Sequence, residues 1–166
     1  MATIKLHGNP INTVGNLPLQ GSKAPAFSLT GKDLNDLSLG HFLGKRIILN
    51  IFPSIDTGVC AASVRKFNSE ITKYDNTVVL CISKDLPFAM GRFCVAEGLE
   101  NVITLSEMRD SEFGIKYGVR ISDGPMAGLF ARAVVLIDSK GIVQYTELVP
   151  DIVMEPDYSS ALLALK

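Results

Sequence analysis

Cys60 is the residue of this sequence whose type and position most directly suggest chemistry. It ends the segment FPSIDTGVC, in which Pro53 terminates an apolar run and a helical pattern starts at position 59. A cysteine in the first turn of a helix lies close to unpaired backbone N–H groups and to the positive end of the helix dipole, which stabilise the thiolate. The thiolate is the nucleophilic form, so Cys60 is a candidate nucleophile. The alternative is that Cys60 is a small buried hydrophobic residue.

Thr57 and Arg132 are candidates for stabilising the charge that such a nucleophile generates. When a thiolate attacks a peroxide, negative charge builds on the departing oxygen, and donors must already point toward it. Thr57 lies three positions before Cys60 and either presents its hydroxyl there or acts only as the N-cap of the helix. Arg132 shares the parity of Val134 in the apolar run 131–137, so its guanidinium is predicted to be buried and to need a partner. That partner is either the thiolate or a carboxylate at the strand end.

The other two cysteines differ in their surroundings. Cys81 lies inside VVLCIS and is predicted to be a buried strand residue. Cys94 lies on the helical pattern 86–98 and is predicted to be partly buried. One interpretation is that Cys94 only packs at the edge of the core and has no chemical role. The apolar face of this helix is predicted to comprise Leu86, Met90 and Phe93.

Alternating strand and helix patterns indicate an α/β fold. Strands are predicted at 26–30, 46–52, 77–83 and 101–105, and an antiparallel pair is predicted at 131–138 and 142–148. Helices are predicted at 59–74, 86–98, 111–118 and 157–166. Runs at 3–7 and 11–14, separated by Gly8, Asn9 and Pro10, predict a β-hairpin extension within residues 1–20. Together these elements predict a thioredoxin-like fold, in which a central mixed β-sheet is flanked by helices and carries an added N-terminal β-hairpin.

Length and composition narrow the classes of function. A chain of 166 residues predicts one domain over 1–166. The 17 acidic and 16 basic residues are not clustered, which argues against nucleic acid and membrane surfaces as partners. The sequence has no signal-peptide pattern, and its odd number of cysteines suits a reducing compartment, so we expect a cytoplasmic protein. His7 and His41 lie far from one another and from the cysteines, and no glycine-rich phosphate loop occurs, so no metal or cofactor is expected.

Several segments resemble one known family. PSIDTGVC fits the Pro-x-x-x-Thr-x-x-Cys signature of peroxiredoxins. SKDLPFAMGRFC and LFARAVVLID resemble the further hallmarks of the thiol peroxidase subfamily, and EPDY extends the similarity almost to the end of the chain. The resemblance implies an atypical two-cysteine peroxiredoxin, in which the disulfide forms within one subunit.

The resemblance also implies a role for each candidate residue. Cys60 would be the peroxidatic nucleophile, Cys94 the resolving cysteine, Pro53 the residue that shields and shapes the pocket, and Thr57 and Arg132 the residues that orient the peroxide. A thiol that condenses with a sulfenic acid protects it from irreversible oxidation. Because a catalytic disulfide must remain reducible, we expect both helices to shift or partly unravel when it forms. The implied substrates are hydrogen peroxide and alkyl or lipid hydroperoxides, the implied reductant is thioredoxin, and the implied assembly is a homodimer.

Two other functions are compatible with the same fold. A thiol–disulfide oxidoreductase normally uses two cysteines separated by two residues, and no pair here has that spacing. A non-catalytic holdase would make the placement of Cys60 coincidental. Four apolar residues near the motifs either line a hydrophobic approach to the site or serve in core packing or a dimer contact: Phe88, Met126, Leu129 and Phe130.

Overall fold

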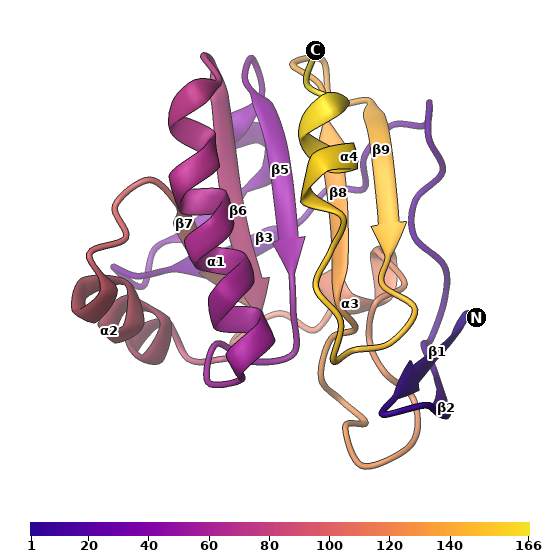
Figure 1. The fold of residues 1–166 in the computed structure, drawn as a ribbon. Coiled ribbons are helices and arrows are strands. Elements are labelled where there is room, and N and C mark those ends of the chain that lie inside the picture. Colours follow the sequence, from indigo (N-terminus) through magenta and orange to yellow (C-terminus); the bar gives the residue numbers. More distant parts are fainter.

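The computed structural model describes residues 1–166, which form a seven-stranded sheet with helices and a separate two-stranded hairpin (Figure 1). The strands of the sheet are β3 (Ser28–Gly31), β4 (Asp36–Ser38), β5 (Arg46–Ile51), β6 (Thr77–Ser83), β7 (Ile103–Ser106), β8 (Ala133–Ile137) and β9 (Val143–Leu148). The helices are α1 (Gly58–Glu70), α2 (Pro87–Glu97), α3 (Phe113–Lys116) and α4 (Tyr158–Leu163), with short 3-10 helices η1 (Leu39–Phe42) and η2 (Ile71–Lys73). The strand order across the sheet is β4-β3-β7-β6-β5-β8-β9.

The centre of the sheet is parallel and its edges are antiparallel, as predicted. β5 pairs in parallel with β6, and β6 with β7, whereas β8 is antiparallel to β5 and β9 is antiparallel to β8. Residues 47–51 of β5 and 79–83 of β6 are all buried, in keeping with their continuous apolar runs. The predicted thioredoxin-like fold is confirmed.

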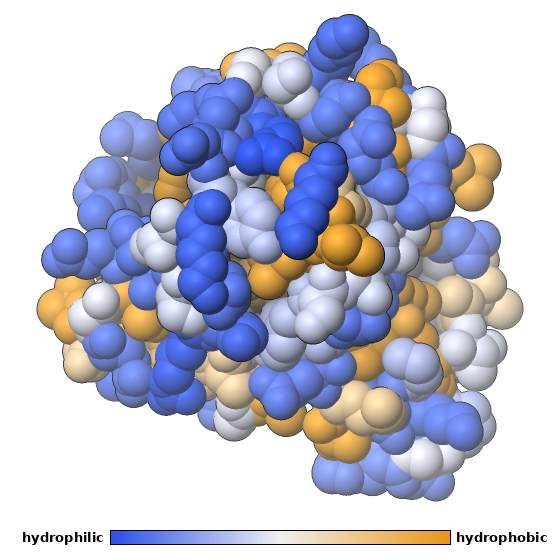
Figure 2. Space-filling model, turned by 45° about the horizontal axis from the view of Figure 1, so that its top comes forward, coloured by the Kyte–Doolittle hydropathy of each residue, from blue (hydrophilic) through white to orange (hydrophobic).

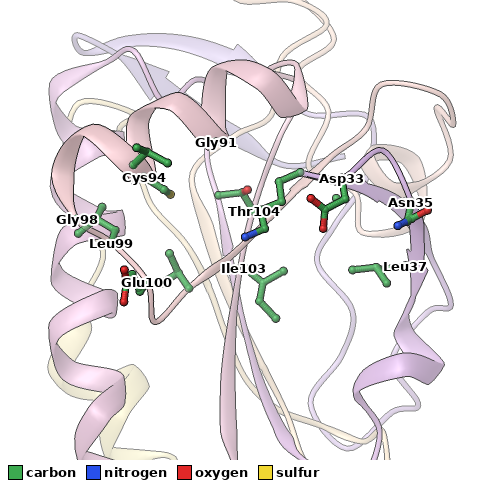
Figure 3. Close-up of a pocket in the computed structure, with 14 residues that line it drawn as sticks. Asp33, Asn35, Leu37, Gly91, Cys94, Gly98, Leu99, Glu100, Ile103 and Thr104 are labelled. Carbon is green, nitrogen blue, oxygen red and sulfur yellow. The ribbon is translucent and has the colours of Figure 1, made fainter.

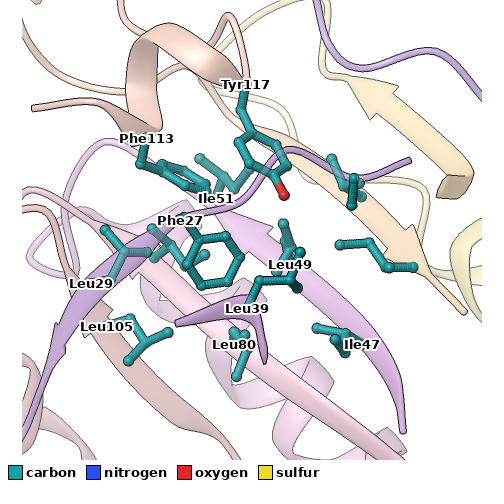
Figure 4. Packing of buried hydrophobic residues seen from close by; sticks show 14 of the residues in the cluster. Phe27, Leu29, Leu39, Ile47, Leu49, Ile51, Leu80, Leu105, Phe113 and Tyr117 are labelled. Carbon is teal, nitrogen blue, oxygen red and sulfur yellow. The ribbon is translucent and has the colours of Figure 1, made fainter. Parts of the chain in front are cut away.

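Hydrophobic cores lie on both faces of the sheet, because successive residues of each strand point to opposite sides. α1, α2 and α4 pack on one face through residues such as Phe67, Met90 and Ala161. α3 and the segment before β3 pack on the other face, where the rings of Phe113 and Tyr117 stack with their centroids 4.5 Å apart (Figure 4). The helices that would carry the site chemistry therefore share one face.

The N-terminal hairpin is present, but its turn differs from the prediction. The hairpin consists of β1 (Thr3–Leu6) and β2 (Asn9–Asn12). Leu6 pairs with Asn9, so the turn contains only His7 and Gly8, with positive φ angles of 51° and 83°. Such two-residue turns match the twist of the strands they join. The expectation that Pro10 belongs to the turn is wrong, because Pro10 lies in β2 on an edge where the missing N–H costs no ladder bond.

Most helices are shorter than their sequence patterns. α1 ends at Glu70 and continues only as η2, and α3 has 4 residues instead of the predicted 111–118. α4 ends at Leu163, whereas the helix was predicted to continue to residue 166, the end of the chain. α2 fits its prediction to within a residue at each end, because Gly98 adopts the left-handed conformation (φ 67°) that commonly terminates a helix.

The surface seen in Figure 2 is mainly hydrophilic, with hydrophobic residues in several separate groups. α2 carries exposed apolar side chains at its start, where Leu86 and Phe88 are 53% and 64% exposed. The prediction that Leu86 faces the core is therefore wrong, since it is the N-cap residue of α2 and lies outside the helix. None of the helices is both long enough and apolar enough to span a membrane.

Candidate active site

Cys60 lies in the first turn of α1, which follows β5 after a short loop. Thr57 has the extended backbone of an N-cap residue (φ −99°, ψ 145°), which confirms the predicted start of the helix to within a residue. The Cys60 side chain is fully buried. Its sulfur thus lies at the carboxyl end of a central strand and at the amino end of a helix, a location where α/β sheets commonly place their sites.

Arg132 contacts Cys60 directly. Its Nη2 donates to Cys60 Sγ at 3.3 Å, and its Nε donates to the carbonyl oxygen of Ile152 at 3.0 Å. The side chain is almost completely buried, as predicted, and Nη1 has no hydrogen-bond partner. No carboxylate forms a salt bridge with Arg132, so the alternative of a strand-end ion pair is excluded. The buried guanidinium is thus placed to donate a hydrogen bond to the sulfur and to any charge that develops beside it.

Thr57 and Pro53 border the same site. The hydroxyl of Thr57 donates to the carbonyl oxygen of Ser54 at 3.1 Å and makes no capping hydrogen bond to α1. Thr57 is thus the N-cap by backbone position only, and its oxygen lone pairs can accept a hydrogen bond from a ligand. Pro53 is buried, and both residues line the cavity next to Arg132.

This cavity has a volume of about 290 Å³ and is lined largely by apolar groups. Its lining residues are Leu6, His7, Pro53, Thr57, Gly58, Val59, Met126, Arg132, Ile152 and Val153. The hairpin, the start of α1 and the segment after β9 therefore supply its walls. Of the four apolar residues considered for a hydrophobic approach, only Met126 belongs to this lining, whereas Phe130 is fully buried in the core.

Asp85 fixes the loop before Cys60, a role that the sequence reasoning missed. Its carboxylate accepts hydrogen bonds from Ser54 Oγ at 2.8 Å, from Ile55 N at 2.7 Å and from Ser83 Oγ at 2.6 Å. Asp85 is the second residue after β6 and lies two positions before the start of α2. Its position after a buried parallel strand was an available signal, because the carboxyl ends of such strands border the sites of α/β folds.

Cys94 opens into a different cavity from the one beside Cys60. It is half-buried on α2 and lines a groove of about 650 Å³ between α2, the β3–β4 turn and the start of β7 (Figure 3). Cys60 is not among the residues that line this groove. Burial raises the pKa of the Cys94 thiol, and the charge of Lys32 partly offsets that effect. All three cysteines are free thiols, so the structure shows the reduced state.

Cys81 and the two histidines lie in contrasting places. Cys81 is fully buried in β6, as predicted, and burial raises its pKa to about 12. His41 is exposed and accepts a hydrogen bond from the backbone N–H of Ser38 at 3.0 Å. His7 lies in the hairpin turn, one position beyond the strand β1, and it also lines the cavity beside Arg132, which sequence spacing did not suggest.

This chain is similar to several known proteins over almost its whole length. The redoxin family model matches residues 19–162. Thiol peroxidases from Mycobacterium bovis and Mycobacterium tuberculosis are 61% identical to this chain over 165 residues, which is 99% of each chain. The crystal structure of a peroxiredoxin-like protein from Aquifex aeolicus has a TM-score of 0.93 at 36% identity, covering 99% of this chain and 96% of that one. A thiol peroxidase from Chromobacterium violaceum shares the fold, with a TM-score of 0.92 at 22% identity over the same shares of the two chains.

The full-length similarity confirms the resemblance carried by the sequence motifs. The redoxin model covers most of the chain, and the mycobacterial relatives match it from end to end. The chain therefore belongs to the redoxin family and, within it, to the thiol peroxidases.

Proposed function

We propose that Cys60 is the peroxidatic nucleophile of this enzyme and that it reduces hydrogen peroxide and organic hydroperoxides. The observation that carries the proposal is the contact of 3.3 Å between Arg132 Nη2 and Cys60 Sγ, made by a buried guanidinium that has no carboxylate partner. A thiolate beside such a group is both stabilised and placed next to a donor for the leaving oxygen.

In the first step, the Cys60 thiolate attacks one oxygen of the peroxide. The S–O bond forms as the O–O bond breaks, giving a sulfenic acid on Cys60 and an alkoxide or hydroxide that takes a proton to leave as alcohol or water. The sulfur is oxidised by two electrons and the peroxide is reduced by two. Arg132 supplies Nη1, which has no partner in the protein, to the departing oxygen. Thr57 accepts a hydrogen bond from the peroxide, while Pro53 excludes water from the sulfur.

The cavity supports organic hydroperoxides as substrates. Its walls include Leu6, Met126, Ile152 and Val153, which offer apolar contact to an alkyl substituent. Its volume of about 290 Å³ exceeds what hydrogen peroxide alone would need. We therefore expect a lower KM for alkyl hydroperoxides than for hydrogen peroxide.

Cys94 is proposed to resolve the sulfenic acid. Its thiolate attacks the Cys60 sulfur, the S–S bond forms, the S–O bond breaks, and hydroxide leaves as water after protonation. Cys60 is fully buried at the start of α1 and does not line the groove into which Cys94 opens, so α1 and α2 must rearrange before this bond can form. A protein dithiol, thioredoxin, then reduces the disulfide by exchange in the cytoplasm. The enzyme is proposed to act as a homodimer whose subunits each consist of one domain and form their own disulfide.

Peroxide consumption driven by thioredoxin, thioredoxin reductase and NADPH tests the proposal. Cys60→Ser should abolish turnover, whereas the matched variant Cys81→Ala should retain it, because Cys81 is fully buried in β6. Full activity of Cys60→Ser would refute the assignment. Reduction of a protein disulfide without any peroxide consumption would instead favour the oxidoreductase alternative, and suppression of aggregation unaffected by Cys60→Ser would favour the holdase.

Mass spectrometry tests the resolving step separately. After one equivalent of peroxide, the reduced protein should contain an intramolecular disulfide between Cys60 and Cys94, with Cys81 free. A bridge to Cys81, or a bridge between subunits, would contradict the proposed role of Cys94.

A further inference from the structure

The N-terminal hairpin is attached to the segment 150–152, which follows β9. The backbone N–H of Lys5 donates to the carbonyl oxygen of Pro150 at 2.8 Å, and the N–H of Ile152 donates to the carbonyl oxygen of Lys5 at 2.9 Å. Between these two bonds lies Asp151. The hairpin and this segment therefore behave as one hydrogen-bonded unit, although more than 140 positions separate them in the chain.

Asp151 clamps the tip of the hairpin. Its carboxylate accepts hydrogen bonds from the N–H of His7 at 3.1 Å and from the N–H of Gly8 at 2.8 Å. Desolvation acts to raise the pKa of Asp151. Backbone hydrogen bonds from Gly8, Val153 and His7, together with the charge of His7, outweigh this effect, so the pKa of Asp151 is lowered. The carboxylate is thus ionised at neutral pH and satisfies two donors of a turn with positive φ angles.

The same segment holds the guanidinium that contacts Cys60. The carbonyl oxygen of Ile152 accepts a hydrogen bond of 3.0 Å from Arg132 Nε, and the N–H of Val149 donates to the carbonyl oxygen of Arg132 at 3.0 Å. The Ile152 side chain is buried in a cluster with Ile4 of the hairpin. A movement of this segment would therefore displace Arg132 relative to the Cys60 sulfur.

We propose that Asp151 is a positioning residue for peroxide reduction, which fixes Arg132 against Cys60 by clamping the hairpin to the segment 150–152. The inference rests on the proposed role of Cys60. The hairpin is then part of the active site in two ways, because Leu6 and His7 also line the cavity. Loss of the clamp should leave the fold in place but loosen the orientation of the guanidinium.

Asp123 provides a matched control. Its carboxylate accepts hydrogen bonds of 2.7 Å from both the backbone N–H and the side-chain amide of Asn12, at the other end of the same hairpin. Asp151 and Asp123 thus each accept two hydrogen bonds from one hairpin, and Asp151 accepts a third, of 3.3 Å, from the N–H of Val153. Only Asp151 lies next to the carbonyl that holds Arg132.

The test compares Asp151→Ala and Asp151→Asn with Asp123→Ala. Turnover of an alkyl hydroperoxide is measured, and the pH dependence of iodoacetamide reaction with Cys60 is followed in a Cys94→Ser background. We expect Asp151→Ala to lower kcat/KM about tenfold and to move the alkylation midpoint to higher pH. Asp151→Asn, which keeps one acceptor oxygen, should show a smaller effect. Asp123→Ala should change both quantities less than about twofold.

Thermal unfolding separates positioning from general stability. Asp151→Ala should lose more stability than Asp123→Ala, because it loses three hydrogen bonds and Asp123→Ala loses two, so the shift in the alkylation midpoint is compared with the stability lost by each variant. Equal effects of Asp151→Ala and Asp123→Ala on the alkylation midpoint, or none from either, would overturn the inference. If Asp151→Ala does not fold, Gly8→Ala, which strains the clamped turn from the other side, must give the shift. Failure of the native enzyme to consume peroxide would refute the proposed function instead, while the alkylation arm would still test the placement of Arg132.

Discussion

Arg132 reaches Cys60 because β8 runs antiparallel to β5. Ala133, the first residue of β8, pairs with Ile51, the last residue of β5. The start of one strand is thereby placed beside the end of the other, and the residue before Ala133 lies level with the loop that leads to α1. From there Arg132 Nη2 comes within 3.3 Å of the Cys60 sulfur. The strand register thus determines which charge the sulfur meets.

Replacement of Arg132 should remove most of the peroxidase activity. Arg132→Met is expected to lower kcat/KM for an alkyl hydroperoxide about 100-fold or more, because one preorganised donor to a developing charge is typically worth that much. Arg132→Lys keeps the charge, but it loses the planar, fixed arrangement of donors with which the guanidinium bonds Ile152 and the Cys60 sulfur. We expect it to be intermediate. Steady-state kinetics with several hydroperoxides provide the measurement.

Arg65→Met is the control for loss of an arginine, because Arg65 pairs with Glu97 on the surface, away from the cavity. It should leave kcat/KM within about twofold of the native value. If Arg132→Met retained native kcat/KM while remaining folded by circular dichroism, the Arg132 contact would have no part in the reaction.

The rate of disulfide formation should keep rising at pH values at which an ordinary thiol is already ionised. Burial raises the pKa of Cys94, so at neutral pH only a small part of it is the attacking thiolate. After stoichiometric peroxide, the rate of disulfide formation should therefore still be rising above pH 9. Stopped-flow mixing followed by an acid quench and mass spectrometry measures this rate.

Lys32 offers a test of the same step, because its charge acts to lower the pKa of Cys94. Lys32→Met should slow disulfide formation at neutral pH and move its pH dependence upward. Lys23→Met is the control, since Lys23 does not line the groove that holds Cys94. A pH-independent rate in the native enzyme would show that a movement of the helices, rather than ionisation of Cys94, limits the step.

The fold was predictable from the sequence because its strongest signals are periodic. The buried runs of β5 and β6 alternate with helical patterns over long stretches, and such patterns set fold class. Helix ends were less predictable, since buried apolar residues continue past the ends of α3 and α4, as Tyr117 and Leu165 do, so the apolar pattern does not mark where the helix ends. The position of the hairpin turn was predicted wrongly because proline is typical of turns, and only the structure shows that Pro10 lies on an edge strand.

The site was predictable only in part. Cys60 and Arg132, which the structure brings into contact, could be singled out as candidates because a helix start and a charged residue in an apolar run are local signals. Asp85 and Asp151 were not found, because each binds backbone N–H groups of a distant loop, and the approach of that loop depends on the whole fold. The burial of Cys60 away from the groove that Cys94 lines likewise follows from helix packing, which spacing in sequence does not reveal.

Cys81 should make the protein less stable at high pH. Burial raises its pKa to about 12, whereas the unfolded thiol has its ordinary value of 9.0. Folding therefore favours the protonated thiol: its full contribution is present below about pH 9 and is lost as the pH rises toward 12, by about 1.4 kcal/mol per pH unit. Urea unfolding at pH 8 and pH 10.5 should show a steeper loss for the native protein than for Cys81→Ala. Parallel losses in the two proteins would rule out this source of alkaline instability.

Gly58→Ala should stabilise the reduced protein and slow formation of the disulfide. Gly58 is the first residue of α1, and a Cβ there would meet no atom within 4 Å. Alanine restricts the unfolded chain and favours the helix, which should raise the free energy of unfolding by about 0.5–1 kcal/mol. If the first turn of α1 must open before Cys60 can reach Cys94, the same stabilisation should slow disulfide formation about two- to fivefold. Rapid-quench mass spectrometry measures that rate, with Gly40→Ala in η1 as the control. An unchanged rate in a stabilised Gly58→Ala protein would show that α1 stays intact and that α2 supplies the whole movement.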